Sequence, residues 1–138
     1  MSFKDFTELP VWQKSSDLLI QVLHITKGFP DDERAGFTSD FRKSAGNISR
    51  YISEGYGTYE KPEKVRYYKN ARANTYDVVN MLIVAQKMSF LNDMHYDELM
   101  EGYKRVVDEL DSLIKSLETK NKPQPQMRFN NRRREYSE

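Results

Sequence analysis

The side chains that could carry out chemistry in this chain are two histidines and three serines. His24 and His95 occur without the Glu-x-x-His spacing that a di-iron helical bundle requires, so we predict no metal site. Ser44, Ser49 and Ser53 follow one another, but no motif of a nucleophilic serine surrounds them. Small residues of this kind allow two helices to approach closely. We therefore predict no catalytic residue and no cofactor, and a protein that is not an enzyme.

The segment Glu54-Gly55-Tyr56-Gly57 has the glycines of a phosphate loop but lacks the Lys-Ser/Thr pair and the strand of a P-loop. We interpret it as a helix end and the turn that follows. Gly55 is the predicted C-terminal cap with a positive φ, a conformation that glycine adopts at little cost. The helix dipole disfavours the Glu54 carboxylate there, so we expect an Arg, a backbone N–H or a partner subunit to offset its charge. Glu54, Gly55 and Gly57 form the predicted structural turn.

Basic residues are the remaining candidates, and they are concentrated in two segments of a chain whose net charge is only +1. Residues 42–72 carry eight basic and three acidic side chains, a balance of +5, and residues 119–138 carry six and two, a balance of +4. Basic residues mixed with aromatic ones are typical of nucleic-acid surfaces, although most charged faces are only solvated. The side chains predicted to bind nucleic acid are Arg42, Lys43, Arg50, Lys61, Lys64, Arg66, Lys69, Arg72, Arg132, Arg133 and Arg134.

Four amphipathic segments must position these residues. Apolar residues recur at helical intervals in each segment, and no segment alternates like a strand. The predicted helices run from about Pro10 to Lys27, Gly36 to Glu54, Lys61 to Ser89 and Asp93 to Glu118. Because the connections are short, neighbouring helices should be antiparallel, which predicts an all-α, up-down-up-down four-helix bundle over residues 1–120. Residues 121–138 contain two prolines and a triple Arg without apolar periodicity, so we predict a flexible basic tail.

This topology brings the two basic segments together. In an up-down bundle, the connection between the second and third helices lies at the same end as the C-terminus of the fourth helix. The opposite end should be acidic, with Asp31, Asp32, Glu33, Asp93, Asp97 and Glu98. The sequence therefore predicts an electrically polar bundle with one basic end.

The third and fourth predicted helices carry more apolar surface than a lone bundle needs. One explanation is a helix pair buried deeply inside the monomer, with Met and Tyr filling gaps. The other, which we favour, is an interface between copies of the chain. The residues predicted to form this interface are Val65, Tyr68, Val79, Ile83, Met100 and Val107.

Four stretches of the chain resemble one known family. The runs FRKSAGNI (residues 41–48) and ISEGYG (residues 52–57) are similar to the second helix and turn of a four-helix-bundle family. This family is named for proteins encoded in intervening sequences of bacterial 23S rRNA genes. The N-terminal run FTELPVW (residues 6–12) and the run RYYKNA (residues 66–71) are similar to its first and third helices. The resemblance covers about residues 6–117.

The resemblance implies a small bacterial protein that assembles as a homopentamer around a central channel, without enzyme activity. A related branch comprises accessory proteins of diversity-generating retroelements, which bind a reverse transcriptase and nucleic acid. We therefore expect a non-enzymatic scaffold that binds RNA, DNA or a nucleoprotein partner through its basic end. The alternative is a protein-only adaptor, such as an accessory subunit of a reverse transcriptase or a partner of a ribosome-associated protein. Tyr51 and Thr58 stand where the family usually has Asn and Arg.

The remaining features concern location. The first ten residues lack the layout of a signal peptide, and the apolar runs are far shorter than the roughly 20 residues that span a bilayer. The chain has no cysteine, which excludes disulfides and thiolate metal sites. A cytoplasmic protein without membrane contact is therefore expected.

Overall fold

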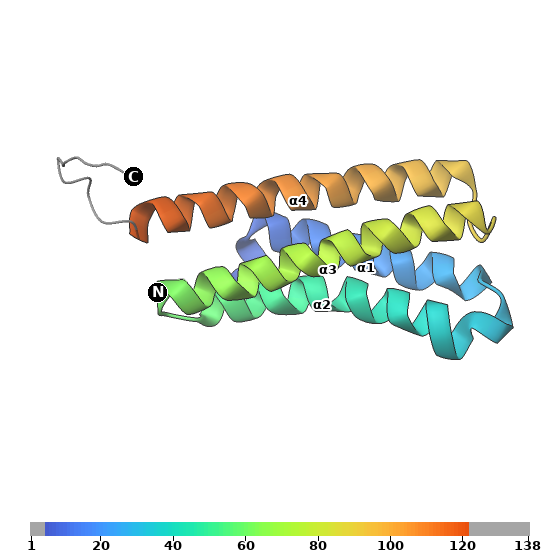
Figure 1. Cartoon of the computed structure of the whole chain (residues 1–138), viewed down its shortest axis with the longest axis horizontal. Helices are drawn as coiled ribbons and strands as arrows, with labels where there is room; N and C mark the ends of the chain where they lie inside the picture. The colour runs from blue at the N-terminus through green and yellow to red at the C-terminus, as the bar shows by residue number, and fades with distance from the viewer. Residues whose placement is uncertain (1–4, 122–138) are drawn as a thin grey trace, which may run out of the picture.

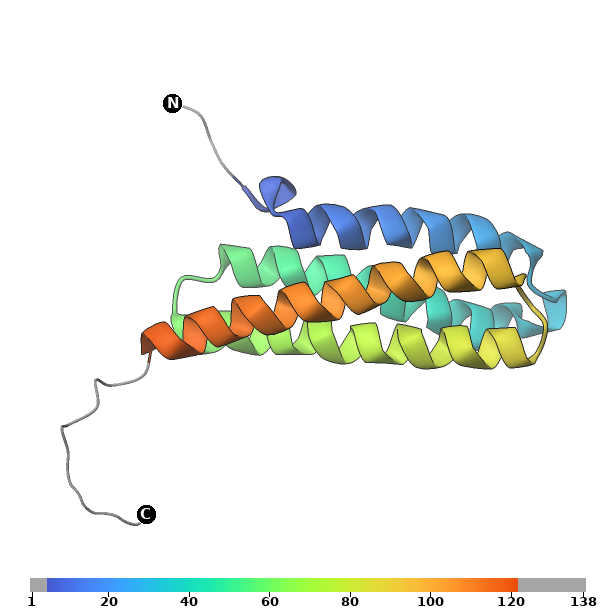
Figure 2. The same ribbon diagram turned by 90° about the horizontal axis from the view of Figure 1, so that it is seen from above.

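The computed structural model describes residues 5–121, and within this range it contains four long helices and no strand. These helices, α1 (Pro10–Ile25), α2 (Ser39–Gly57), α3 (Lys61–Lys87) and α4 (Asp93–Asn121), pass alternately up and down the long axis (Figures 1 and 2). α2 packs along α3, α3 along α4, and α1 closes the bundle against α2 and α4. The predicted all-α, up-down-up-down four-helix bundle is confirmed.

The helix limits follow from the local sequence. Pro10 is the first residue of α1 and Pro62 the second residue of α3, where the missing proline N–H has no helical partner anyway. The start of α2 differs from the prediction of Gly36. A 3-10 turn (Asp31–Glu33) and one π-helical turn (Arg34–Thr38) come first, and α2 begins at Ser39.

Apolar side chains from all four helices form one core. Val22 of α1, Ile48 of α2, Leu82 of α3 and Leu110 of α4 are fully buried. Each large apolar side chain stabilises the fold by about 1.5–3 kcal/mol when it is removed from water. This shared core explains why the amphipathic periodicity of the sequence was sufficient to predict the bundle.

A phenylalanine cluster closes the end of the bundle where the α1–α2 and α3–α4 connections meet. It consists of Phe29, Phe37, Phe41 and Phe90, whose ring centroids lie 5.4–6.3 Å apart in five contacting pairs. In Figures 1 and 2 this end lies at the right, and the α2–α3 turn and the end of α4 lie at the left. The cluster ties both connections to the core.

The prediction that Gly55 caps α2 with a positive φ is wrong. α2 continues to Gly57, and no glycine in the described residues has a positive φ. Gly55 is buried, and a Cβ atom built on it would lie 2.8 Å from Cε1 of Tyr68. The glycine is therefore required because α3 packs a tyrosine ring against the α2 backbone, which leaves no room for a side chain.

The predicted subunit interface divides into two groups. Val65 and Tyr68 are only 7 % and 3 % exposed within a single copy, so their assignment to an interface between copies is corrected. For these two residues the alternative explanation holds, because they have almost no surface left to bury. Met100 and Val107, at 9 % exposure each, likewise have little surface left to bury, whereas Val79 and Ile83 remain partly exposed on α3 and keep surface that an interface could bury.

Two further expectations concern the chain end and membranes. The predicted tail, including Arg132, Arg133 and Arg134, lies outside the described residues, except for Asn121, which ends α4. Among the described helices, none combines the length and the apolar character needed to cross a bilayer.

Candidate nucleic-acid interface

The bundle separates the basic residues that the sequence predicted to converge. Arg42 and Lys43 lie in the first turn of α2, at the end closed by the phenylalanine cluster. Gly57, at the other end of α2, is 15 residues beyond Arg42, or about 23 Å at the rise of an α-helix. The expectation that all the predicted basic residues share one end is therefore wrong for these two.

Arg42 instead closes the C-terminus of α1. Its Nε donates to Oγ1 of Thr26 at 2.7 Å, and its Nη2 donates to the carbonyl oxygen of Leu23 at 3.4 Å. Carbonyl groups in the last turn of a helix lack intrahelical partners, and a cation there also interacts favourably with the helix dipole. Arg42 thus has a structural role that its position in the sequence did not reveal.

At the opposite end, Lys64 of α3 closes the C-terminus of α2. Its Nζ donates to the carbonyl oxygens of Gly55 at 2.8 Å and Tyr56 at 3.0 Å, and burial lowers the pKa of Lys64. Thr58 completes the cap, because its Oγ1 donates to the carbonyl oxygen of Glu54 at 2.7 Å. Side chains thereby donate to three carbonyls in the last turn of α2, of which that of Gly55 also accepts from the N–H of Thr58 at 3.2 Å, and no residue there has a positive φ.

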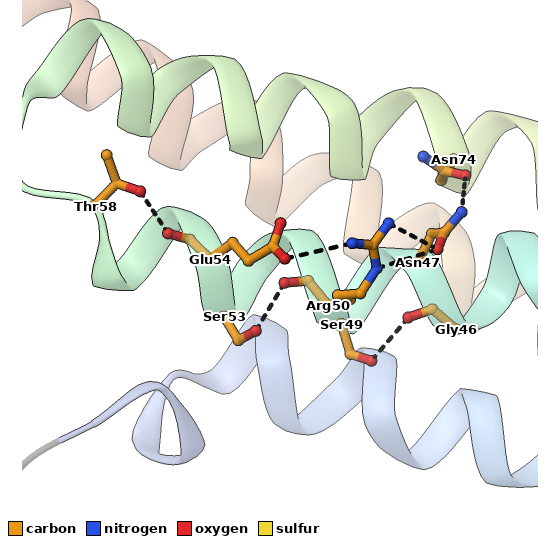
Figure 3. A network of polar contacts seen from close by, with 8 residues as sticks. All are labelled: Gly46, Asn47, Ser49, Arg50, Ser53, Glu54, Thr58 and Asn74. Atoms are coloured by element: carbon orange, nitrogen blue, oxygen red, sulfur yellow. Dashed lines mark hydrogen bonds and ion pairs between the residues drawn. The ribbon is translucent and has the colours of Figure 1, made fainter.

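A polar network offsets the carboxylate of Glu54 (Figure 3). Nη1 of Arg50 lies 3.3 Å from Oε2 of Glu54, and Nη2 of Arg50 donates to Oδ1 of Asn47 at 3.2 Å. Nδ2 of Asn47 donates to Oδ1 of Asn74 on α3 at 3.4 Å, so the network links two helices. The expectation that an Arg would offset Glu54 is confirmed.

Two of the three candidate serines of α2 donate hydrogen bonds to carbonyl groups of their own helix. Oγ of Ser49 donates to the carbonyl oxygen of Gly46 at 3.4 Å, and Oγ of Ser53 donates to that of Arg50 at 2.7 Å. Both lie on the side of α2 that faces α1 (Figure 3). This arrangement matches the interpretation that small residues let the helices approach.

Carboxylates of α4 pair with the cations of α3. Nζ of Lys69 lies 2.9 Å from Oε2 of Glu118, and Nη1 of Arg72 lies 2.8 Å from Oδ1 of Asp111. Within α3, Arg66 pairs with Glu63. These side chains are partly exposed, so each pair contributes little to stability and can exchange its partner for another anion.

Sequence reasoning missed the two pairs between α3 and α4 because it counted charges along the chain and not across helices. The pairs run in opposite directions along α3 and α4, as an antiparallel hairpin requires. The alignment of α3 against α4 in that hairpin was the signal that could have revealed the pairs. Lys61 keeps an exposed position in the first turn of α3, beside Tyr59, which is 90 % exposed in the α2–α3 turn.

His24 and His95, which lie far apart in the sequence, are brought together by the fold. Both line a cavity of about 330 Å³ between α1 and α4, with Glu98 and the apolar Ile25 and Leu99. In the described part of the chain, no group of three or more His, Cys, Asp or Glu side chains could hold a metal ion. The cavity is a groove between two helices.

Comparison with known proteins gives a family match for this chain. No curated protein is similar enough to the chain to count as a match. The family described as 23S rRNA-intervening sequence protein matches residues 7–112, which is more than half of the chain and includes all of α1, α2 and α3. This range also agrees with the stretch over which the sequence motifs suggested a resemblance. The chain therefore belongs to the family of 23S rRNA-intervening sequence proteins.

Proposed function

We propose that this protein is a non-enzymatic scaffold that assembles with copies of itself and contacts RNA or DNA, or a nucleoprotein complex, through the α2–α3 end of the bundle. The observation that carries the proposal is the exposed ring of Tyr59 beside Lys61 in the α2–α3 turn. An exposed aromatic ring next to cations can stack on a base while the cations contact phosphates. Arg66 adds a cation whose partner Glu63 is also exposed and can be displaced.

Assembly is supported by a groove between α3 and α4 with a volume of about 650 Å³. Val79, Ile83, Tyr96 and Met100 supply its apolar lining. Tyr76 is 57 % exposed and precedes Val79 by one helical turn, so it extends the apolar stripe of α3. A second copy that covers this groove would remove the stripe from water. The number of five copies is supported by the family resemblance alone.

Salt dependence of binding is the test of the nucleic-acid contact. Anisotropy of labelled single-stranded RNA and duplex DNA is measured over a series of salt concentrations. Phosphate contacts release counterions, so log affinity should fall linearly with log salt. Lys61→Gln should weaken binding and reduce the slope by about 1, whereas Lys87→Gln, at the far end of α3, should change neither. Absence of binding at low salt would reject the nucleic-acid contact.

Light scattering at micromolar concentration tests assembly. Ile83→Glu should dissociate the oligomer because it places a carboxylate in an apolar interface. Asn70→Glu adds the same charge on an exposed part of α3 and should leave the oligomer intact, and circular dichroism checks that both variants fold. A monomeric wild-type protein would reject self-assembly.

A protein-only adaptor is the second candidate, and the ion pairs favour it. Lys69, Arg72 and Arg66 already have carboxylate partners, which lowers the positive potential of the α3 face. An accessory subunit of a reverse transcriptase would fit such a surface. Affinity for a protein partner that is insensitive to salt, with no affinity for nucleic acid, would select this function.

A further inference from the structure

A second cavity lies at the end of the bundle away from the proposed nucleic-acid contact, between the C-terminus of α1 and the start of α2. Its volume is about 320 Å³, at the lower end of the range for small-molecule sites. The polar and charged residues that line it are Thr26, Lys27, Asp31, Arg34, Thr38 and Arg42. Three of them are cations and one is an acid, so the lining is positive in sum.

Thr38 has a buried hydroxyl group whose hydrogen-bonding capacity is not satisfied within the described residues. The residue is 4 % exposed, and its Oγ1 has no hydrogen-bond partner in the described residues. Buried hydroxyl groups nearly always have a partner, because an unsatisfied one costs stability. Thr38 is also the last residue of the π-helical turn, a rare element that often occurs at functional sites.

Arg42 has N–H groups that make no hydrogen bond in the described residues, and its guanidinium group is held in place. Of its five N–H groups, one donates to Oγ1 of Thr26 at 2.7 Å, and a second makes a long contact of 3.4 Å with the carbonyl oxygen of Leu23. Thr26 is itself held, since its Oγ1 donates to the carbonyl oxygen of Val22 at 2.6 Å. The guanidinium group is therefore positioned at the cavity before any ligand arrives.

We propose that this cavity binds a phosphate group carried by a small molecule. The guanidinium groups of Arg42 and Arg34 supply donors to its oxygens, Lys27 adds a further positive charge, and Thr38 adds its unpartnered hydroxyl group when the side chain turns toward the ligand. Arginine matches the geometry of phosphate oxygens, and such charge-assisted hydrogen bonds are strong. Asp31 is the competing anion, because its Oδ1 lies 2.9 Å from Nη2 of Arg34 in an exposed pair that phosphate can displace. The site does not depend on the proposed function, which concerns the opposite end.

Titration of the full-length protein with inorganic phosphate, followed by amide chemical shifts in NMR spectra, tests this site. We expect saturable shifts concentrated in residues 26–42, with a dissociation constant on the order of 1 mM. Chloride at matched ionic strength should not produce them, and acetate should bind more weakly because it offers fewer oxygens. The proposal is overturned if the shifts do not saturate, if chloride reproduces them, or if they lie elsewhere.

Paired variants sharpen the test. Arg34→Gln should weaken phosphate binding by about tenfold, and Asp31→Asn should strengthen it, since it removes the competing carboxylate. Both side chains are highly exposed, at 76 % and 92 %, so neither change should disturb folding. Thr38→Val should also weaken binding while the protein stays folded, and Arg50→Gln, near the other end of α2, is the control. Wild-type affinity in both Arg34→Gln and Thr38→Val would overturn the proposal.

Discussion

At each end of the bundle, a cation from one helix closes the C-terminus of the helix before it. Arg42 does so for α1, at the end that holds the phenylalanine cluster. Lys64 does so for α2, at the end where an exposed turn carries Tyr59. The aromatic rings are thus packed against one another at one end, whereas at the other end an aromatic ring is presented to solvent. The comparison teaches that the role of a cation cannot be assigned from the sequence alone, because it depends on which helix end the side chain reaches in the fold.

The largest expected effect is a difference in stability between variants of the aromatic residues at the two ends. Phe41→Ala removes a ring that is 1 % exposed in the phenylalanine cluster and should lower the free energy of unfolding by about 3–5 kcal/mol. Tyr59→Ala removes an exposed ring at the other end and should change it by less than about 0.5 kcal/mol. Urea unfolding followed by circular dichroism measures both. Equal losses would show that the two ends do not differ in packing.

The next effect concerns the contact between Gly55 and Tyr68. Gly55→Val forces a side chain into the tyrosine ring and should destabilise the protein by about 1–3 kcal/mol, as overpacking does. Gly57→Ala, which meets no atom within 4 Å, is the control and should not destabilise the fold. Because the cause is steric, Tyr68→Leu should relieve part of the cost of Gly55→Val in a double-mutant cycle. Strict additivity of the two changes would contradict the steric explanation.

The same two residues show what could be predicted from the sequence. Apolar periodicity gave the four helices, because the core face of each helix repeats along its own sequence. It could not show that Gly55 lies inside a helix. The residue is a glycine because a ring on α3 leaves no room for a side chain, and that contact does not appear in the periodicity of α2. Likewise, the offset of Glu54 by Arg50 was predictable because the two are one turn apart, whereas the partners of Lys69 and Arg72 lie on α4. Contacts between residues one turn apart could be predicted from the sequence, whereas contacts between helices could not.

The lysines of the α2–α3 end should differ in their contribution to stability. Lys64→Met removes the ammonium group that donates to the carbonyl oxygens of Gly55 and Tyr56, the first of which keeps the N–H of Thr58, and should cost about 1–2 kcal/mol. Lys61→Met changes an exposed side chain three residues away and should be close to neutral. Thermal unfolding of the two variants side by side measures the difference. If Lys61→Met were the more harmful change, the assignment of Lys64 as the cap of α2 would fail.

The smallest effect is a loss of stability at alkaline pH at this same end. Burial, with a smaller contribution from nearby Tyr56, raises the pKa of Tyr68 from its ordinary value of 10.0 to about 12. Between these two values the unfolded chain has lost the tyrosine proton and the folded protein has kept it. The unfolded state therefore binds fewer protons in this window, and stability must fall as the pH rises through it. Below pH 10 the contribution of Tyr68 is constant.

Tyr68→Phe isolates this contribution, because phenylalanine has no proton to lose. Burial lowers the pKa of Lys64, whose ammonium group lies 6.0 Å from the centroid of the Tyr68 ring, so its contribution to stability rises with pH up to its ordinary pKa of 10.5, opposite in direction to that of Tyr68. The measurement is therefore the difference in unfolding free energy between wild type and Tyr68→Phe, taken at several pH values from 9 to 12. This difference should shift in favour of Tyr68→Phe as the pH rises, whereas Tyr59→Phe, at an exposed tyrosine, should follow wild type. Parallel curves for all three proteins would mean that the hydroxyl group of Tyr68 reaches water, and that the α2–α3 end is open more deeply than its packing indicates.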